Sequence, residues 1–230
     1  GVILEPVARR SATLAAYAEV YLEEEIRREA LVRDIGAFAR FLAVAAQESG
    51  QVMNLAGLSQ ESGVPVATLR NFYGVLVDTF VGTWIPPYGR AGRKQILATP
   101  RFVFFDPGVR NAAAELPLSR DLLKTQAGPL FEQWVLTELA HRASYLGRGH
   151  RVSFWRTRHG AEVDVVLETP REDVPVEVKW TENPRPADAR HVELFLDRYP
   201  ARARRGFVVC RVARARKLTD RVTAIPWDSL

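Results

Sequence analysis

Two acidic residues and a lysine interrupt apolar runs between residues 160 and 180. Asp164 lies within "GAEVDVVLE", and Glu177 and Lys179 lie within "PVEVKW". A charge buried among apolar residues is unfavourable unless it is paired or binds a metal ion. Carboxylates on rigid strands offer the oxygen ligands that Mg²⁺ prefers, and a lysine beside them stabilises a phosphate or orients a metal-bound water. These residues therefore form a candidate site for chemistry on phosphate.

The spacing predicts that the three side chains converge on one face of a β-sheet. Side chains alternate along a strand, so Glu177 and Lys179 share a face. Strict alternation over residues 161–167 places Asp164 on the face opposite Val163. The segment "ETPRED" supplies a turn between the two strands, which brings their polar faces together if the strands are neighbours. Glu132, on a preceding helix, can add another carboxylate from the side.

Other interpretations of these charges stay open. The three site residues also fit an ion pair at the edge of a sheet. Glu162 and Glu168 are interpreted as solvated charges or charges at strand ends. Arg156 and Arg158 flank the predicted turn beside the site, where they contact phosphate or simply belong to a solvated turn.

The elements that must position this site follow from hydrophobic periodicity. From residue 128 the expected order is α-β-β-β-α-β, which is an α/β layer architecture. Residues 107–127 are expected to form a loop with short helical turns. The predicted helices are 128–146 and 186–198, and the predicted strands are 151–157, 161–168, 174–181, 206–212 and 222–226.

The first half of the chain has the pattern of a winged helix-turn-helix. Helices are expected at 11–31, at 34–49, at about 55–62 and after Pro65, where an apolar stripe runs from Val66 to Phe80. A β-hairpin with a basic tip follows. Such a module binds DNA, or it serves as an architectural or protein-binding unit. The candidate DNA contacts are Thr68, Arg70 and Asn71 on the second helix of the motif, and Arg90, Arg93 and Lys94 at the hairpin tip.

Composition excludes several classes of protein. The 230-residue chain is 47% hydrophobic, which excludes a disordered protein, and its apolar runs are too short to span a membrane. The single cysteine, Cys210, allows no internal disulfide, and no signal peptide is recognisable, so a cytoplasmic location is expected. The net charge is +5, and residues 201–221 carry eight basic residues against one acid, which is compatible with nucleic acid.

Asp164, the triplet Glu177–Val178–Lys179 and the expected element order resemble the PD-(D/E)xK nuclease superfamily, which has the restriction-endonuclease-like fold. Glu132 matches the acidic residue that many members carry on their first helix. The resemblance implies that Asp164, Glu177 and Glu132 bind Mg²⁺ or Mn²⁺ and that Lys179 positions the water or steadies the phosphate. Val163 stands where the superfamily often has proline.

The segments "YLEEEIR", "VRDIGAFARFL", "FFDPGVRNA", "FEQWVLTEL", "FWRTRHGAEVDVVLE" and "PVEVKW" together resemble the C-terminal module of a prokaryotic family of AAA-type ATPases of unknown function. The resemblance implies an ATPase preceding this chain as its partner domain. The chain itself carries no Walker motif, so no nucleotide site is expected in it. The implied domains are 1–33, the end of an ATPase lid; 34–106, the winged helix-turn-helix; and 107–230, the nuclease-like domain. The first residue is Gly1, which fits a separated C-terminal part.

The expected fold is therefore α/β overall (α+β), and the expected function is metal-dependent DNA phosphodiesterase activity. The alternative is a non-catalytic module that tethers the ATPase to DNA or to a protein. A transcription regulator that uses only the winged helix is a third hypothesis, which the single basic residue of its recognition helix, Arg70, argues against.

Overall fold

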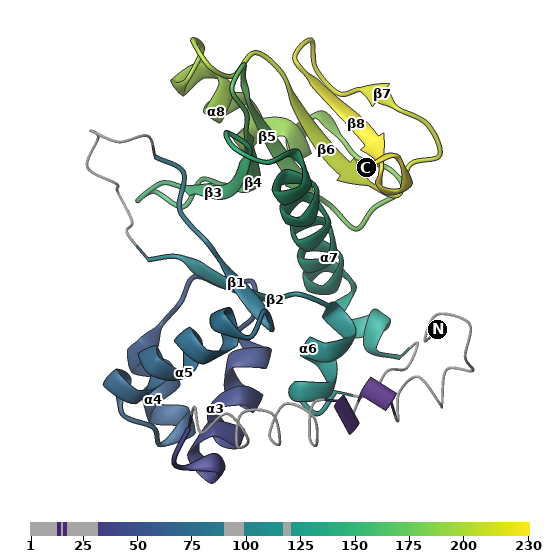
Figure 1. Ribbon diagram of the computed structural model, residues 1–230. Helices are drawn as coiled ribbons and strands as arrows, with labels where there is room; N and C mark the ends of the chain where they lie inside the picture. The colour runs from purple at the N-terminus through teal and green to yellow at the C-terminus, as the bar shows by residue number, and fades with distance from the viewer. Residues whose placement is uncertain (1–12, 15, 18–31, 90–98, 117–120) are drawn as a thin grey trace. The chain divides into compact units, whose positions relative to one another are not determined.

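The computed structural model describes residues 13–14, 16–17, 32–89, 99–116 and 121–230 (Figure 1). The chain forms two compact units, each described by itself below. Unit 1 comprises Gly1–Trp84 and Arg101–Gln126, and unit 2 comprises Ile85–Pro100 and Ala127–Leu230. Most of the predicted helix at 11–31 lies outside the described residues. Among the residues that are described, no helix is both long and apolar enough to cross a membrane.

Unit 1 contains short helices and a two-stranded sheet of β1 and β2. Side-chain caps begin three of its helices, because Asp34, Asn54 and Asp106 each accept a hydrogen bond from a backbone N–H three residues later. Gly63 ends α4 with a φ of +68°, a conformation that glycine adopts readily. The elements are α3 (Ile35–Gln47), α4 (Leu55–Ser62), α5 (Val66–Asp78), β1 (Gly82–Ile85), β2 (Arg101–Phe104) and α6 (Pro107–Ala113).

An aromatic cluster forms the core of unit 1. Phe38 and Phe41 of α3 pack against Phe72 and Tyr73 of α5, with ring centroids between 4.9 and 5.4 Å apart. Aromatic pairs at these separations stabilise a core beyond the area that they bury. The helix positions predicted from periodicity at 34–49 and about 55–62 are confirmed by α3 and α4, because periodicity and caps mark the same boundaries.

The apolar stripe predicted for α5 is wrong at both ends, because Val66 is 36% exposed and Phe80 is not part of the helix. Leu69, Tyr73 and Leu76 are buried, but Phe80 lies beyond the helix and is 85% exposed. Its φ is +61°, so the chain leaves the helix there, and Val81 N–H donates to Leu76 O at 2.8 Å. Val81, and not Phe80, is buried in the core, because the left-handed backbone conformation of Phe80 turns the chain inward.

We expect Phe80→Gly to raise the free energy of unfolding by up to about 1 kcal/mol. The exposed ring loses little burial, and glycine removes the steric strain of a positive φ at the expense of some chain entropy. Chemical denaturation measures the difference. Val77→Gly, at a partly buried position inside α5, is the control and should be destabilising. A Phe80→Gly variant less stable than the parent chain would contradict the argument.

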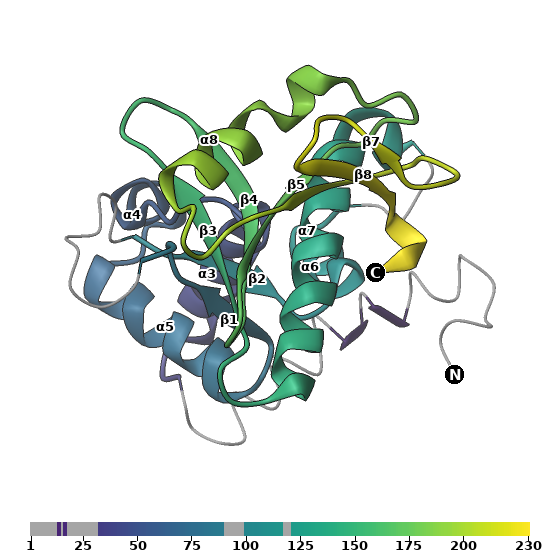
Figure 2. The ribbon, with the colours of Figure 1, turned by 90° about the horizontal axis from the view of Figure 1, so that it is seen from above.

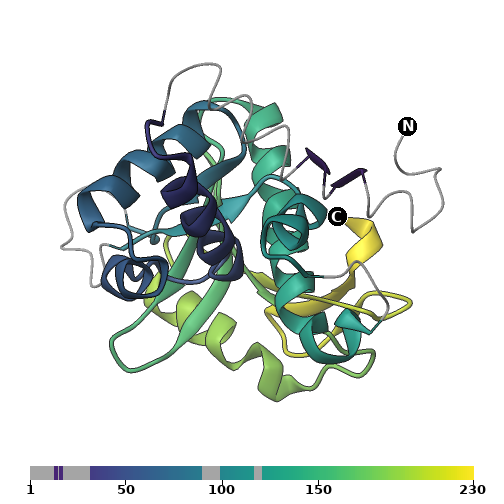
Figure 3. The same cartoon turned by 90° about the horizontal axis from the view of Figure 1, so that it is seen from below.

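Unit 2 is built on a six-stranded sheet of order β3-β4-β5-β6-β8-β7. Strands β3, β4 and β5 are antiparallel neighbours, and β5, β6 and β8 are parallel. Helices α7 and α8 lie on opposite faces of this sheet (Figures 2 and 3). The elements are α7 (Leu122–Leu146, which begins in unit 1), β3 (Arg151–Arg156), β4 (Glu162–Glu168), β5 (Asp173–Val178), η3 (Pro186–Ala189), α8 (Arg190–Arg198), β6 (Gly206–Cys210), β7 (Arg216–Lys217), β8 (Val222–Pro226) and η4 (Trp227–Ser229).

The helix predicted from residue 128 begins earlier, at Leu122, because two helices join at Gln126. Gln126 has a non-helical φ of −126° and ψ of 18°. The second helix therefore starts just after it, and Pro129 falls in the first turn, where its missing N–H has no helical partner to lose. The predicted loop at 107–127 holds the helix α6 and the first turns of α7, and both belong to unit 1 up to Gln126.

A β-bulge in β4 overturns the alternation expected for residues 161–167. Ser153 pairs with Val166 and Trp155 pairs with Val163, so two residues of β4, Asp164 and Val165, lie opposite the single residue Phe154. The extra residue shifts the side-chain alternation. Val163 and Val166 are consequently buried in the same cluster beneath α8, although strict alternation places them on opposite faces.

Residues that follow β1 cover the edge of β3. Phe154 N–H donates to Pro86 O at 3.1 Å, and Tyr88 N–H donates to Phe154 O at 2.6 Å. The Tyr88 ring packs against Phe195 and Tyr199, each with centroids 5.0 Å away. This segment satisfies backbone groups that an open edge strand leaves unpaired.

Candidate active site

Asp164 is held against the end of β5 by a backbone hydrogen bond. Its Oδ2 accepts from Val178 N–H at 2.8 Å. The pairing of β4 with β5 extends as far as Val165 and Val176, so the carboxylate lies where this pairing ends and the bulge in β4 begins. The structure thereby brings Asp164 next to the Glu177–Lys179 segment, as the predicted pairing of these strands requires.

Glu177 is a buried carboxylate whose hydrogen bonding is incomplete. The residue is 5% exposed. Its Oε1 accepts from Lys179 Nζ at 2.7 Å, whereas its buried Oε2 has no hydrogen-bond partner within the described structure. Burial raises the pKa of Glu177 to about 7, and the negative charges of Asp164 and Glu132 add to this rise while Lys179 opposes it. The site is therefore short of positive charge around Glu177.

Lys179 provides a half-exposed cation beside this carboxylate. Its side chain is 41% exposed. Burial alone lowers the pKa of Lys179, but the carboxylates of Glu177, Asp164 and Asp188 together raise it above its ordinary value. The ammonium group is consequently charged at neutral pH.

Glu132 lies on α7 and contributes the weakest of the charges that act on Glu177. Among the described residues, no group of three or more histidine, cysteine, aspartate or glutamate side chains is arranged to hold a metal ion. As they are placed, Glu132, Asp164 and Glu177 thus do not form a three-carboxylate ligand set. Mg²⁺ is commonly held by one or two carboxylates and several waters. The orphaned Oε2 of Glu177 and its raised pKa fit a divalent cation held by Asp164 and Glu177.

Two residues of the following helical segment approach the site although the sequence reasoning gave them no role. Asp188 of η3 helps to raise the pKa of Lys179. His191 of α8 has a pKa lowered by burial and by the charges of Arg190 and Lys179, and Asp164 opposes this shift. Only the predicted position of the helix at 186–198, directly after the Glu177–Lys179 strand, could have indicated their proximity.

The predicted nucleic-acid contacts fall on separate parts of the chain. Arg70 and Asn71 are exposed on α5 and Thr68 is half-buried, all in unit 1. In unit 2, Arg156 and Arg158 are exposed, and Arg156 Nε lies 3.6 Å from Glu162 Oε2. The predicted contacts Arg90, Arg93 and Lys94 lie outside the described residues.

The interpretation of Glu168 as a solvated charge is wrong, whereas its interpretation as a charge at a strand end holds, because Glu168 is the last residue of β4. Glu168 is 3% exposed and lies opposite Asp173, which is fully buried. Ser153 Oγ and Arg151 Nη2 donate to Glu168 at 2.8 and 2.7 Å, and this pairing makes the buried charge tolerable. The network sits at the opposite end of β4 and β5 from Asp164.

Comparison with known proteins identifies two domains of unknown function. Residues 127–230 match the family model of the domain DUF4143, and residues 2–120 match that of the domain DUF8612. The first match begins at Ala127, where the second segment of unit 2 also begins. No curated protein and no solved structure matches the chain. Because the second match covers more than half of the 230 residues, the chain belongs to the family defined by the domain of unknown function DUF8612.

Proposed function

We propose that this chain is a metal-dependent DNA phosphodiesterase module of nuclease-like type, coupled to a winged helix. The observation that carries the proposal is the buried, hydrogen-bond-deficient Oε2 of Glu177 beside Asp164 and Lys179. Buried polar atoms that serve only the fold are usually hydrogen-bonded, so an unbonded carboxylate oxygen suggests another role. Strongly shifted pKa values, such as the pKa of about 7 of Glu177, are also typical of functional sites.

In this proposal each residue of the site has a distinct role. When bound, Mg²⁺ or Mn²⁺ supplies Lewis-acid activation of a phosphate and lowers the pKa of a water ligand. Asp164, whose orientation is set by Val178 N–H, and Glu177, through Oε2, hold the cation. Lys179 places a positive charge against the scissile phosphate and stabilises the charge that develops there. Glu132 orients the outer shell of the site from α7.

Nicking of supercoiled plasmid DNA tests the proposal. We expect cleavage that depends on Mg²⁺ or Mn²⁺ and falls at least about a hundred-fold in Asp164→Ala and in Lys179→Ala, because each change removes a group that stabilises the transition state. Lys124→Ala is the matched control, since Lys124 pairs with Asp121 on the surface of unit 1. Equal cleavage by all four proteins would indicate a contaminating nuclease and refute the assignment.

DNA is the proposed substrate because of the charge distribution. Eight basic residues against one acid over 201–221 favour phosphate binding. In unit 1 the helices α3, α4 and α5 precede the paired strands β1 and β2, which is the order of a winged helix. We propose that Thr68, Arg70 and Asn71 on α5, with Arg90, Arg93 and Lys94, contact the backbone of duplex DNA. An AAA-type ATPase that precedes the chain is the proposed partner.

A second candidate function is a non-catalytic module that tethers such an ATPase to DNA or to a protein. The observation that favours it is the absence, among the described residues, of a three-ligand metal cluster. This function predicts salt-sensitive DNA binding that Asp164→Ala, Glu177→Gln and Lys179→Ala leave intact, without any cleavage by the parent chain.

A further inference from the structure

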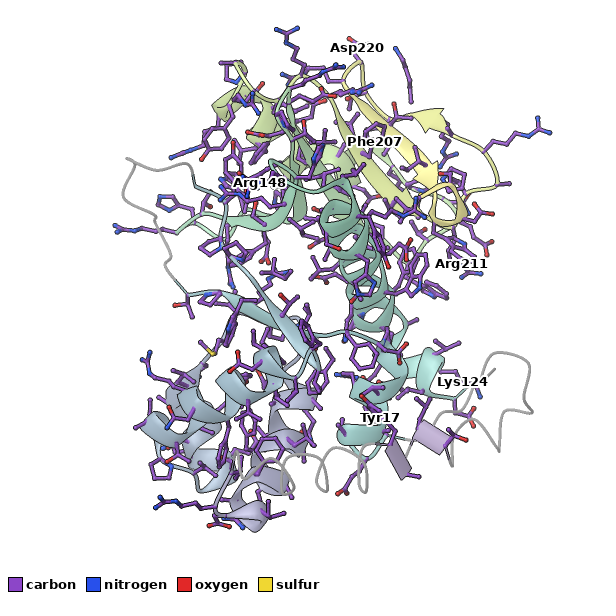
Figure 4. The ribbon with its side chains drawn as sticks, viewed as in Figure 1. Tyr17, Lys124, Arg148, Phe207, Arg211 and Asp220 are labelled. Atoms are coloured by element: carbon purple, nitrogen blue, oxygen red, sulfur yellow. The ribbon has the colours of Figure 1, made fainter. Side chains whose placement is uncertain are left out.

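Three neighbouring parallel strands of unit 2 end on the same side of the sheet, and large or basic side chains follow their ends. Val178 of β5 pairs with Val209 of β6, and Cys210 of β6 pairs with Pro226 of β8. The carboxyl ends of neighbouring parallel strands lie side by side. Arg211 and Trp227 directly follow β6 and β8, and Trp180 lies two residues beyond the end of β5. Figure 4 labels Arg211 beside the ends of β6 and β8.

These side chains join two residues of α7 in one continuous row. The guanidinium carbon of Arg211 lies 4.3 Å from the centroid of the Trp180 ring. Phe131 meets the Trp180 ring edge-on at 5.2 Å, and Trp134 meets Trp227 edge-on at 5.4 Å. Phe131 and Trp134 are nearly parallel, with centroids 6.3 Å apart. We call Phe131, Trp134, Trp180, Trp227 and Arg211 the aromatic platform.

The platform is open to solvent at both ends. Trp180 is 41% exposed and Trp227 is 43% exposed. Single exposed apolar residues are common, but these two tryptophans are joined beneath the surface by Phe131, which is 7% exposed, and by Trp134, and Arg211 lies over the Trp180 ring. Tryptophan and arginine both present flat π-faces, on which nucleobases stack.

The charge next to the platform favours a nucleic acid over a protein as its ligand. Residues 211–217, "RVARARK", contain four basic residues and no acid, and all four are exposed. Within the part of the chain that the structure describes, Arg211 pairs with Glu182, while Arg214 and Lys217 make no ion pair. Such a loop is available to phosphates, whereas a protein interface typically excludes most charge from its core.

We propose that the aromatic platform binds unpaired bases of a single-stranded nucleic acid, whose phosphates are held by Arg211, Arg214 and Lys217. Trp180 directly follows Lys179 in the chain, so the platform begins one residue from the carboxylate site. The inference rests in part on the proposed function, because it specifies the form of nucleic acid that this site takes: a single strand, or a duplex with an unpaired end.

Fluorescence anisotropy in EDTA separates this binding from cleavage. The probes are labelled oligo(dT) of about 20 nucleotides, which exceeds the usual site size of one binding domain, and a blunt duplex of the same length. We expect the parent chain to prefer oligo(dT), and Trp180→Ala, Trp227→Ala and Arg211→Gln each to weaken its binding about 5-fold or more. Trp180→Phe, which keeps a stacking ring, should stay within about 3-fold of the parent chain.

Tyr145→Ala is the matched control, because Tyr145 is 89% exposed on α7 and outside the platform. Its binding should equal that of the parent chain, and thermal unfolding should show that all variants are folded. Unchanged oligo(dT) binding in the platform variants would overturn the inference and leave the phosphodiesterase proposal intact. Loss of self-association in sedimentation, without any effect on oligo(dT), would reassign the platform to protein contact and also overturn it. Preserved binding without cleavage would refute only the phosphodiesterase.

Discussion

At about pH 8, Glu177→Gln should be more stable than the parent chain by up to about 3 kcal/mol. Glu177 is buried, its pKa is raised to about 7 from 4.5, and burial is the main cause. Ionising this group in the folded chain is therefore unfavourable. Glutamine keeps the shape of the side chain and an oxygen that accepts from Lys179, but it carries no charge to bury.

The way in which stability changes with pH follows from the pKa values of Glu177 in the unfolded and in the folded chain. Between 4.5 and about 7 the folded chain holds a proton on Glu177 that the unfolded chain has lost. Stability of the parent chain thus falls as pH rises through this window, and the full penalty is present above it. Glu177→Gln should lack this contribution, so the two proteins should have similar stability near pH 4.5 and diverge toward pH 8.

Urea denaturation at several pH values measures this difference. Glu182→Gln is the matched control, since Glu182 is an exposed acid whose ion pair with Arg211 contributes little. Added Mn²⁺ provides a second readout: it should stabilise the parent chain at about pH 8 and have less effect on Glu177→Gln, because ligand binding to the folded state alone raises stability. A Glu177→Gln variant that is less stable than the parent chain at every pH would show that its carboxylate is fully compensated in the fold.

The positions of most elements could be predicted because local signals agree there. The strands at β4 and β5 are apolar runs separated by a turn segment, and antiparallel neighbours joined by a short turn necessarily bring Asp164 near Glu177. The helix predicted at 186–198 is present as η3 and α8, and its buried residues Val192, Phe195 and Leu196 lie on the side of α8 that packs on β4, β5 and β6, whereas Leu194, which the prediction placed on this face, is exposed. In these cases the apolar pattern in the sequence both predicts the element and determines which of its sides is buried.

The details that escaped prediction depend on contacts between distant parts of the chain. The bulge at Asp164–Val165 arises from pairing with β3, and no local signal in "AEVDVVLE" marks an extra residue. Tyr88 reaches the sheet from a segment far earlier in the sequence. The burial of Glu168 depends on Ser153 and Arg151, whose proximity requires knowledge of the strand register.

Arg202 supports a buried acidic pair that sequence reasoning did not detect. Glu168 and Asp173 lie opposite each other on β4 and β5, and Asp173 is fully buried. Arg202 Nη2 donates to Asp173 Oδ1 at 3.0 Å and to Thr169 O at 2.7 Å, while Tyr88 Oη donates to Asp173 Oδ2 at 2.7 Å. The arginine thus neutralises Asp173 and also closes the turn between the two strands.

We expect Arg202→Ala to lower the free energy of unfolding by about 3 to 5 kcal/mol, because it removes a cation that pairs with the buried charge of Asp173 at 3.0 Å. Arg205→Ala is the matched control three residues later: Arg205 pairs with Glu172, next to Asp173, but its side chain is 62% exposed, so we expect a loss of less than about 1 kcal/mol. Urea denaturation of both variants gives the comparison. Equal losses would show that water reaches Asp173 as easily as it reaches Glu172. A large difference is expected although the two ion pairs have similar N–O distances of 3.0 and 2.7 Å, because Asp173 is buried and Arg202 also donates to Thr169 O.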